Sequence, residues 1–76
     1  MANTKIIRGY TVFYDDSAAK GIEHLAYVLS IEESDSMFSS VRSTGKLKFE
    51  DRLGRNYTLI YNFDGTFKVE RRSDWW

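Results

Sequence analysis

The chain has 76 residues, of which 42% are hydrophobic and 16% aromatic, and its 11 basic and 11 acidic side chains give a formal net charge of zero. This length predicts a single domain, residues 1–76, and excludes two cores of ordinary size. The absence of cysteine excludes disulfides and thiolate metal sites, and no apolar run reaches the roughly 20 residues that a membrane-spanning helix needs.

The same composition bears on the compartment. Small secreted domains usually rely on disulfides, which this chain cannot form. The first residues lack the apolar stretch that is typical of a secretory signal peptide. We therefore expect a cytoplasmic protein that does not bind membranes.

Residues 5–14 are rich in β-branched and aromatic side chains, which predicts one strand. Apolar groups fall on both of its faces, with Ile7 and Phe13 on one. The other face carries Ile6, Tyr10, Val12 and Tyr14. A strand with two apolar faces is central in a sheet or covered on both sides. Gly9 is interpreted as a bulge or a point of close backbone approach.

A helix is predicted after Asp15-Asp16-Ser17, whose side chains are typical helix N-caps. Its apolar residues recur at helical spacing and form one stripe: Ala18, Ile22, Leu25, Ala26 and Leu29. Gly21 lies inside this helix, where glycine costs about 1 kcal/mol relative to alanine. We expect Gly21 to allow the helix to approach the sheet closely.

Residues 30–45 contain six serines, and their structure is less clearly indicated. Ser30-Ile31-Glu32-Glu33 matches a capping box, which predicts a short second helix. Such a helix would carry Met37, Phe38 and Val41 toward the core. An extended segment over residues 34–43 is the alternative.

From Lys46 onward apolar and polar residues alternate, which predicts three strands joined by two hairpin loops. Each loop has three residues and ends in glycine, at Arg52-Leu53-Gly54 and Phe63-Asp64-Gly65. We expect a type I turn followed by a glycine at positive φ. This register places Phe49 opposite Tyr57 and Val69 opposite Leu59, whereas a two-residue turn would mix polar and apolar groups on both faces.

The inner face of these strands should then be apolar and covered by the helix. Its members are Leu47, Phe49, Tyr57, Leu59, Tyr61, Phe67 and Val69. The fold class is therefore α+β: a small two-layer domain with an N-terminal strand, one main helix and then a three-stranded antiparallel meander. The pattern does not determine which strand lies beside residues 5–14.

The outer face of the meander is the first candidate surface. The register aligns Lys46, Ile60 and Lys68 in one row, with an exposed isoleucine at the middle. Lys48 and Arg72 belong to the next two rows. The charge distribution agrees: residues 39–76 carry eight basic and five acidic side chains, against three and six in residues 1–38.

Two tryptophans near the end of the chain, Trp75 and Trp76, are the second candidate. Their large apolar area must either cap the core or contact a partner, and tryptophan and arginine are enriched at binding hot spots. Both alternatives stay open at this point.

The sequence contains no glycine-rich phosphate loop, no G-x-S-x-G motif and no H-E-x-x-H motif. His24 is the only histidine, and it has no neighbouring nucleophile at a useful spacing. The acidic clusters at Asp15-Asp16 and residues 32–35 lack the alternation of a calcium loop. We therefore expect no catalytic residues, no cofactor and no metal.

These observations favour a small non-catalytic protein-binding module, such as an inhibitor, an immunity protein or a phage accessory protein that occludes a macromolecular partner. The expected contact residues are Lys46, Lys48, Ile60, Lys68, Arg72, Trp75 and Trp76. The alternative is a nucleic-acid-binding module that uses the same basic face. The aromatic side chains of the meander point inward, which counts against nucleic acid. The oligomeric state is left open.

Overall fold

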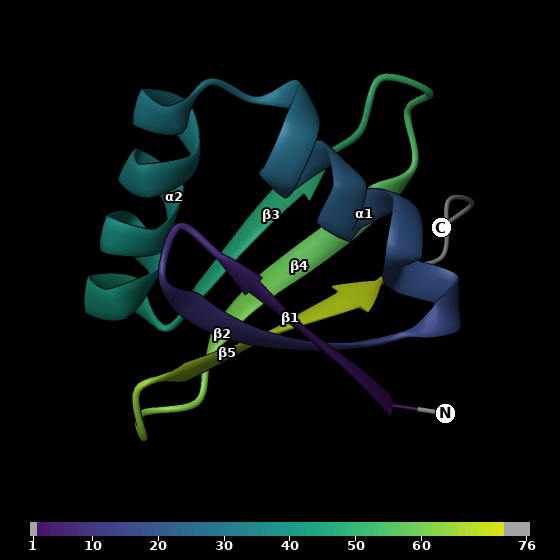
Figure 1. Ribbon diagram of the computed structural model, residues 1–76. Helices are drawn as coiled ribbons and strands as arrows, with labels where there is room; N and C mark the ends of the chain where they lie inside the picture. The colour runs from purple at the N-terminus through teal and green to yellow at the C-terminus, as the bar shows by residue number, and fades with distance from the viewer. Residues whose placement is uncertain (1, 73–76) are drawn as a thin grey trace.

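Five strands form one mixed sheet in the computed structural model of the chain, which describes residues 2–72 (Figure 1). The strands are β1 Ala2–Ile7, β2 Tyr10–Asp15, β3 Lys46–Glu50, β4 Asn56–Tyr61 and β5 Thr66–Arg71. Their order across the sheet is β1-β2-β5-β4-β3. β2 and β5 run parallel, and the other neighbouring pairs are antiparallel. The α+β class with a C-terminal meander is confirmed.

The predicted helix consists of three short, consecutive helical segments that follow β2. A 3₁₀ turn at Asp16–Ala18 (η1) leads into α1, Ala19–Glu23, which continues as a π-helical turn at His24–Val28 (η2). The stripe is oriented as predicted, because Ala18, Ile22 and Leu25 are buried and Ala26 and Leu29 pack against the core. The predicted N-cap is wrong, since the side chain of Asp15 makes no capping hydrogen bond.

The second helix, α2, spans Ile31–Thr44 and is the longest helix of the described chain, so the prediction of one main helix was incomplete. It begins with the predicted capping box. The Glu33 amide donates to Ser30 Oγ at 3.1 Å, and the Ser30 amide donates to a Glu33 carboxylate oxygen at 3.1 Å. Phe38 and Val41 are buried, and Met37 packs against the core. The extended alternative for residues 34–43 is wrong.

Residues 5–14 do not form one strand. They contain a β-hairpin whose two-residue turn, Arg8-Gly9, has φ values of 52° and 85°. Two successive positive φ angles are typical of a type I′ turn, which joins antiparallel strands. Ile7 lies opposite Tyr10 across this turn, on the core side.

The hairpin reverses the face predicted for β1. In a continuous strand, Ile7 and Tyr10 would point to opposite faces because they are three residues apart. In the hairpin they are paired, so they point the same way. Ile7 is therefore buried and Ile6 is 69% exposed. The sequence had predicted that Ile6, not Ile7, shares a face with Tyr10.

The meander has the predicted register. Phe49 lies opposite Tyr57, and Val69 lies opposite Leu59. Gly54 and Gly65 have φ values of 78° and 91°, as the three-residue loops require. The predicted inner face is confirmed: Tyr57, Leu59, Phe67 and Val69 are buried, and Leu47, Phe49 and Tyr61 pack against them.

The second loop differs from the expected turn type. Phe63 has a φ of 63°, whereas the first residue of a type I turn has a negative φ. The ring of Phe63 lies 5.0 Å from that of Tyr61, centroid to centroid, and Phe63 is 76% exposed. The loop keeps its length and its register with this different backbone.

At Gly21 the helical layer lies so close to the sheet that no side chain would fit between them. A Cβ atom built on Gly21 would lie 2.7 Å from Cδ1 of Tyr57 and 2.9 Å from two other ring atoms. Real side chains do not tolerate such distances, so any residue other than glycine must move the ring or the helix. The expected close approach is confirmed.

We predict that Gly21→Ala destabilises the protein. Alanine favours the helix by about 1 kcal/mol, but overpacking in a rigid core costs about 1–3 kcal/mol. The steric term should exceed the propensity term, because the ring of Tyr57 is fully buried and cannot move freely. Urea unfolding, followed by circular dichroism, measures the change.

The matched control is Ser39→Ala, at an exposed position of α2. This substitution should change the free energy of unfolding by less than about 0.5 kcal/mol. A Gly21→Ala variant with a higher urea midpoint than the parent would show that the contact with Tyr57 does not limit the approach of the helix.

Candidate functional site

Both helical segments pack on one face of the sheet. Ile22 and Leu25 from the first segment, and Phe38 and Val41 from α2, join a core with the inward-facing strand residues. No helix of residues 2–72 packs on the opposite side. We call that side the open face: it consists of the alternate strand residues that point away from the helices.

The central row of the open face contains the three residues predicted for it, and a fourth residue from β2 extends it. Lys46 lies opposite Ile60, and Ile60 lies opposite Lys68. Because β2 pairs with β5, Phe13 lies beside Lys68 in the same row. The sequence did not place Phe13 here, since its strand had no assigned neighbour.

Apolar side chains on the open face differ in exposure. Ile6 is 69% exposed and Phe13 is 38% exposed. Ile60 is half-buried, so the expectation of an exposed isoleucine at the middle was too simple. Around them lie threonines of the neighbouring strands, Thr11, Thr58 and Thr66. The open face is therefore partly apolar at its centre.

The charges on the open face are mixed, because Lys46, Lys48 and Lys68 share it with Asp15, Glu50 and Glu70. Lys46 and Lys48 are exposed, and neither forms an ion pair with another of residues 2–72. Lys68 lies 3.2 Å from a Glu70 carboxylate oxygen, with both side chains about half exposed. Such a surface pair contributes little stability and can be broken by a partner at small cost.

Arg72 is less available than predicted. Its Nε donates a hydrogen bond to the carbonyl oxygen of Tyr57 at 3.3 Å, and its side chain is half-buried. The other predicted contact residues, Trp75 and Trp76, lie outside the described residues. The structure therefore brings together Lys46, Lys48, Ile60 and Lys68, with Arg72 at the end of the sheet.

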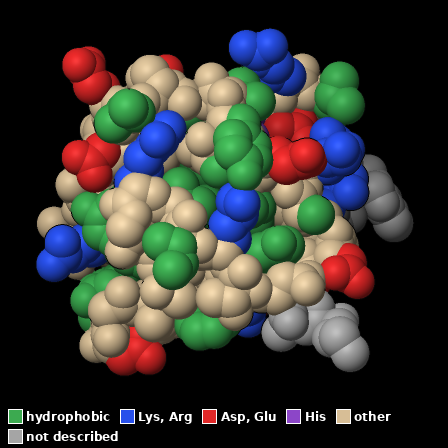
Figure 2. Space-filling view, viewed as in Figure 1, with side chains coloured by type: hydrophobic (Ala, Val, Ile, Leu, Met, Phe, Trp, Pro, Cys, Tyr) green, Lys and Arg blue, Asp and Glu red, His purple; other side chains and the backbone are tan. Residues whose placement is uncertain are grey.

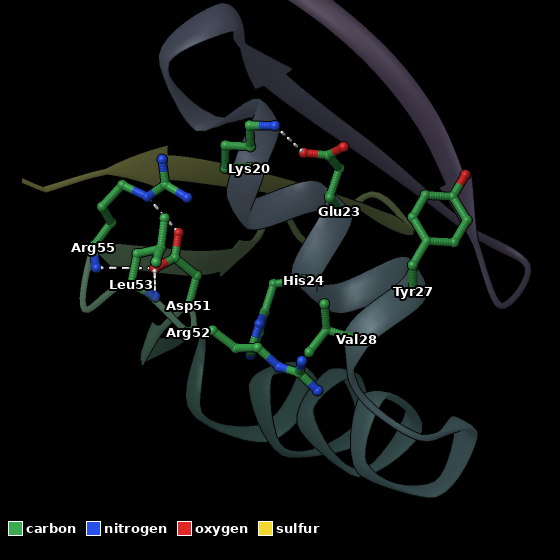
Figure 3. A pocket seen from close by; sticks show the side chains of 9 residues that line it. All are labelled: Lys20, Glu23, His24, Tyr27, Val28, Asp51, Arg52, Leu53 and Arg55. Carbon is green, nitrogen blue, oxygen red and sulfur yellow. Dashed lines mark hydrogen bonds and ion pairs between the residues drawn. The ribbon is translucent and has the colours of Figure 1, made fainter.

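A pocket of about 300 Å³ lies elsewhere, between the helical turns and the β3–β4 loop. We call it the loop pocket, and its lining residues are Lys20, Glu23, His24, Tyr27, Val28, Asp51, Arg52, Leu53 and Arg55 (Figure 3). Residues from positions 20–28 and 51–55 meet there, a contact that no local sequence pattern signals. The sequence did not predict this pocket.

Asp51 organises the loop side of the pocket. Its carboxylate accepts hydrogen bonds from the amides of Leu53 and Arg55, at 2.9 and 3.0 Å, and from Arg55 Nε at 2.6 Å. The Tyr57 hydroxyl donates to the same carboxylate at 3.0 Å. Burial alone would raise the pKa of Asp51, but the hydrogen bonds from Arg55, Tyr57 and Leu53 lower it to about 2.

The pKa of the Tyr57 hydroxyl shifts the other way. Burial raises it, and the hydrogen bond to the Asp51 carboxylate raises it further. The phenol is therefore protonated at neutral pH and acts as a donor to Asp51. This pair of shifts indicates a structural network that fixes the loop.

His24 lies in the π-helical turn at the side of the pocket. Its ring is nearly parallel to that of Phe49, with centroids 6.2 Å apart. Its Nδ1 atom is buried and has no hydrogen-bond partner among residues 2–72. The geometry places His24 beside an aromatic ring of the core rather than beside a serine or threonine that it could activate.

The acidic clusters have structural contacts. Asp16 accepts a hydrogen bond from Asn3 Nδ2 at 2.7 Å, and Glu33 belongs to the capping box. Within residues 2–72, no three His, Cys, Asp or Glu side chains lie close enough to hold a metal ion together. None of the helices in the same residues has the length and apolar character needed to cross a membrane.

Comparisons with protein-family models, with curated proteins and with solved structures found no match to this chain. The function must therefore be argued from the two surfaces described above. The open face offers area and a central row in which Ile60 and Phe13 alternate with lysines. The loop pocket offers a concave site with charged and apolar walls.

We predict that Asp51→Asn destabilises the protein by about 2 kcal/mol at neutral pH. The pKa of Asp51 falls from 3.8 to about 2, which means that the folded state favours the charged carboxylate by about 2 kcal/mol. Asparagine keeps the shape but loses the charge that Arg55 and Tyr57 contact. Chemical denaturation at pH 7 measures the difference.

The same substitution should change the pH dependence of stability. Because the folded-state pKa of Asp51 lies below the unfolded value, its contribution is fully present above about pH 4 and is lost as the pH falls toward 2. The parent should therefore lose this stability between pH 4 and 2, and Asp51→Asn should lack that component. Equal losses in both proteins would contradict the assignment.

Proposed function

We propose that this protein is a small non-catalytic binding module that docks the open face of its sheet against a protein partner and occludes it. The observation that carries the proposal is the one-sided cover of the sheet. A five-stranded sheet buries one face against two helical segments and leaves the other with Ile6, Phe13 and Ile60 at its surface. This mode of binding would suit an inhibitor, an immunity protein or a phage accessory protein.

The composition of the open face favours a protein over nucleic acid. Its apolar residues are two isoleucines and one phenylalanine, and its lysines are mixed with Glu50 and Glu70. Protein interfaces combine an apolar centre with a charged, hydrated rim. Single-stranded nucleic acids need several aromatic rings and an unbroken basic track. The expected partner surface has an apolar centre and acidic residues that meet Lys46 and Lys48.

Nucleic-acid binding is the second candidate, and one observation favours it. Phe13 lies beside Lys68 on the open face, so an aromatic ring and a cation adjoin there. This placement removes part of the objection that all aromatic rings point inward. One ring can stack on one base, so such binding would be weak and would depend strongly on salt.

The test compares capture of partners from extracts of the source cell by the immobilised protein and by two matched pairs of variants. Ile6→Asp and Lys46→Glu alter the open face, while Ile31→Asp and Arg42→Glu make the corresponding apolar-to-acidic and basic-to-acidic changes on α2. Ile6 and Ile31 are 69% and 64% exposed, so neither substitution should unfold the protein. Circular dichroism confirms folding before each comparison.

We expect a protein partner that the α2 variants retain and the open-face variants lose by about tenfold or more. Capture should survive nuclease treatment. Equal capture by both pairs of variants would overturn the open face as the interface. Loss of capture after nuclease, together with oligonucleotide binding that weakens steeply with salt, would favour the second candidate.

A further inference from the structure

The loop pocket has exposed apolar side chains at its rim. Tyr27, Val28 and Leu53 are 70%, 38% and 77% exposed, so they contribute little to the core. All three line the same pocket, with the first two from the π-helical turn and Leu53 from the β3–β4 loop (Figure 3). Apolar side chains that converge on a concave site are typical of ligand pockets.

The side of the molecule seen in Figure 1 shows no single broad apolar patch. Figure 2 views the side seen in Figure 1, and its hydrophobic side chains are interspersed with charged ones rather than joined in one broad patch. A broad apolar patch would indicate a protein interface. A small concave site that combines a few apolar side chains with charged ones instead suits a small polar or charged molecule.

Among residues 2–72, one cation of the pocket lining has neither a hydrogen bond nor an ion pair. Lys20 pairs with Glu23 at 3.1 Å, and Arg55 pairs with Asp51 at 2.6 Å. Arg52 has no hydrogen bond or ion pair with any other of residues 2–72, although it lines the pocket with Leu53 and Val28. The lining therefore carries a net positive charge beside an apolar rim.

The helical side of the pocket is set by an unusual backbone. The Leu29 amide donates to the His24 carbonyl oxygen at 3.0 Å, which closes a π-helical turn. Such turns insert an extra residue into a helix and occur frequently at functional sites. Here the turn includes His24, Tyr27 and Val28, all of which line the pocket.

We propose that the loop pocket binds a small apolar carboxylic acid. The carboxylate pairs with the Arg52 guanidinium, a match that favours two parallel hydrogen bonds. The apolar body, about the size of one aromatic ring, packs against Val28 and Leu53, while the ring of Tyr27 lies at the rim and is directed away from them (Figure 3). The volume of about 300 Å³ lies at the small end of ligand pockets. This site is separate from the open face.

The experiment titrates ¹⁵N-labelled protein with 3-phenylpropionate and, separately, with its uncharged amide, 3-phenylpropionamide. Two-dimensional NMR spectra report which amides shift. We expect saturable shifts at positions 27–28 and 51–55, with a dissociation constant on the order of 1 mM for so small a ligand. The acid should bind at least about fivefold more tightly than the amide, because only the acid pairs with Arg52.

Two variants locate the charge. Arg52→Gln should reduce the affinity for the acid to that for the amide, and it should leave the affinity for the amide unchanged. Arg42→Gln, which removes an exposed charge from α2, should leave the preference for the acid intact. Both residues are exposed, so both variants should fold like the parent.

Leu53→Ser tests the apolar part of the proposal. It should weaken the acid and the amide by similar factors, because it removes apolar contact and leaves Arg52 in place. Equal affinities of the parent for acid and amide, an unchanged preference in Arg52→Gln, or shifts centred on β3 and β5 would each overturn the proposal. These results are independent of the capture experiment, which uses substitutions outside the pocket.

Discussion

The position of Tyr57 is the constraint on which the rest of the structure depends. Its ring lies against the backbone of Gly21, where no side chain would fit, and its hydroxyl donates to Asp51. One side chain thus joins the helical layer, the middle of the meander and the β3–β4 loop. The close approach of α1 to β4 and the shape of the loop wall of the pocket both depend on this side chain, because only a glycine backbone fits against its ring and its hydroxyl holds Asp51.

This constraint also separates the two candidate surfaces. Asp51 is held by Arg55 and Tyr57, so the loop between β3 and β4 has a defined shape despite its exposed Leu53. The loop pocket is built on that shape. The open face depends instead on the register of the strands. A substitution on one surface should therefore leave the other in place, which allows their roles to be tested separately.

Much of the meander could be predicted because local chemistry sets its register. Gly54 and Gly65 provide positive φ, and the alternation of apolar residues allows only one pairing that fills the inner face. The first hairpin could not be recognised in this way. Arg8, a residue that rarely adopts positive φ, occupies the turn, and apolar groups on both faces hide the reversal. The pairing of β2 with β5 and the meeting of residues 20–28 with 51–55 are long-range contacts without a local signal.

The uneven distribution of charge along the sequence gives the helical layer an excess of acidic side chains and places exposed lysines at one edge of the sheet. Helical residues 16–44 carry five acidic and two basic side chains, while the exposed Lys46 and Lys48 lie on the edge of the sheet. The molecule is neutral overall, so it has no long-range attraction to polyanions as a whole. Its electrostatic field can instead orient a charged partner, because an acidic surface is attracted to the lysine edge and repelled by the helices. For the protein partner proposed above, such a field would align an acidic surface with the open face before contact, whereas a flexible nucleic acid could follow the few lysines without being oriented.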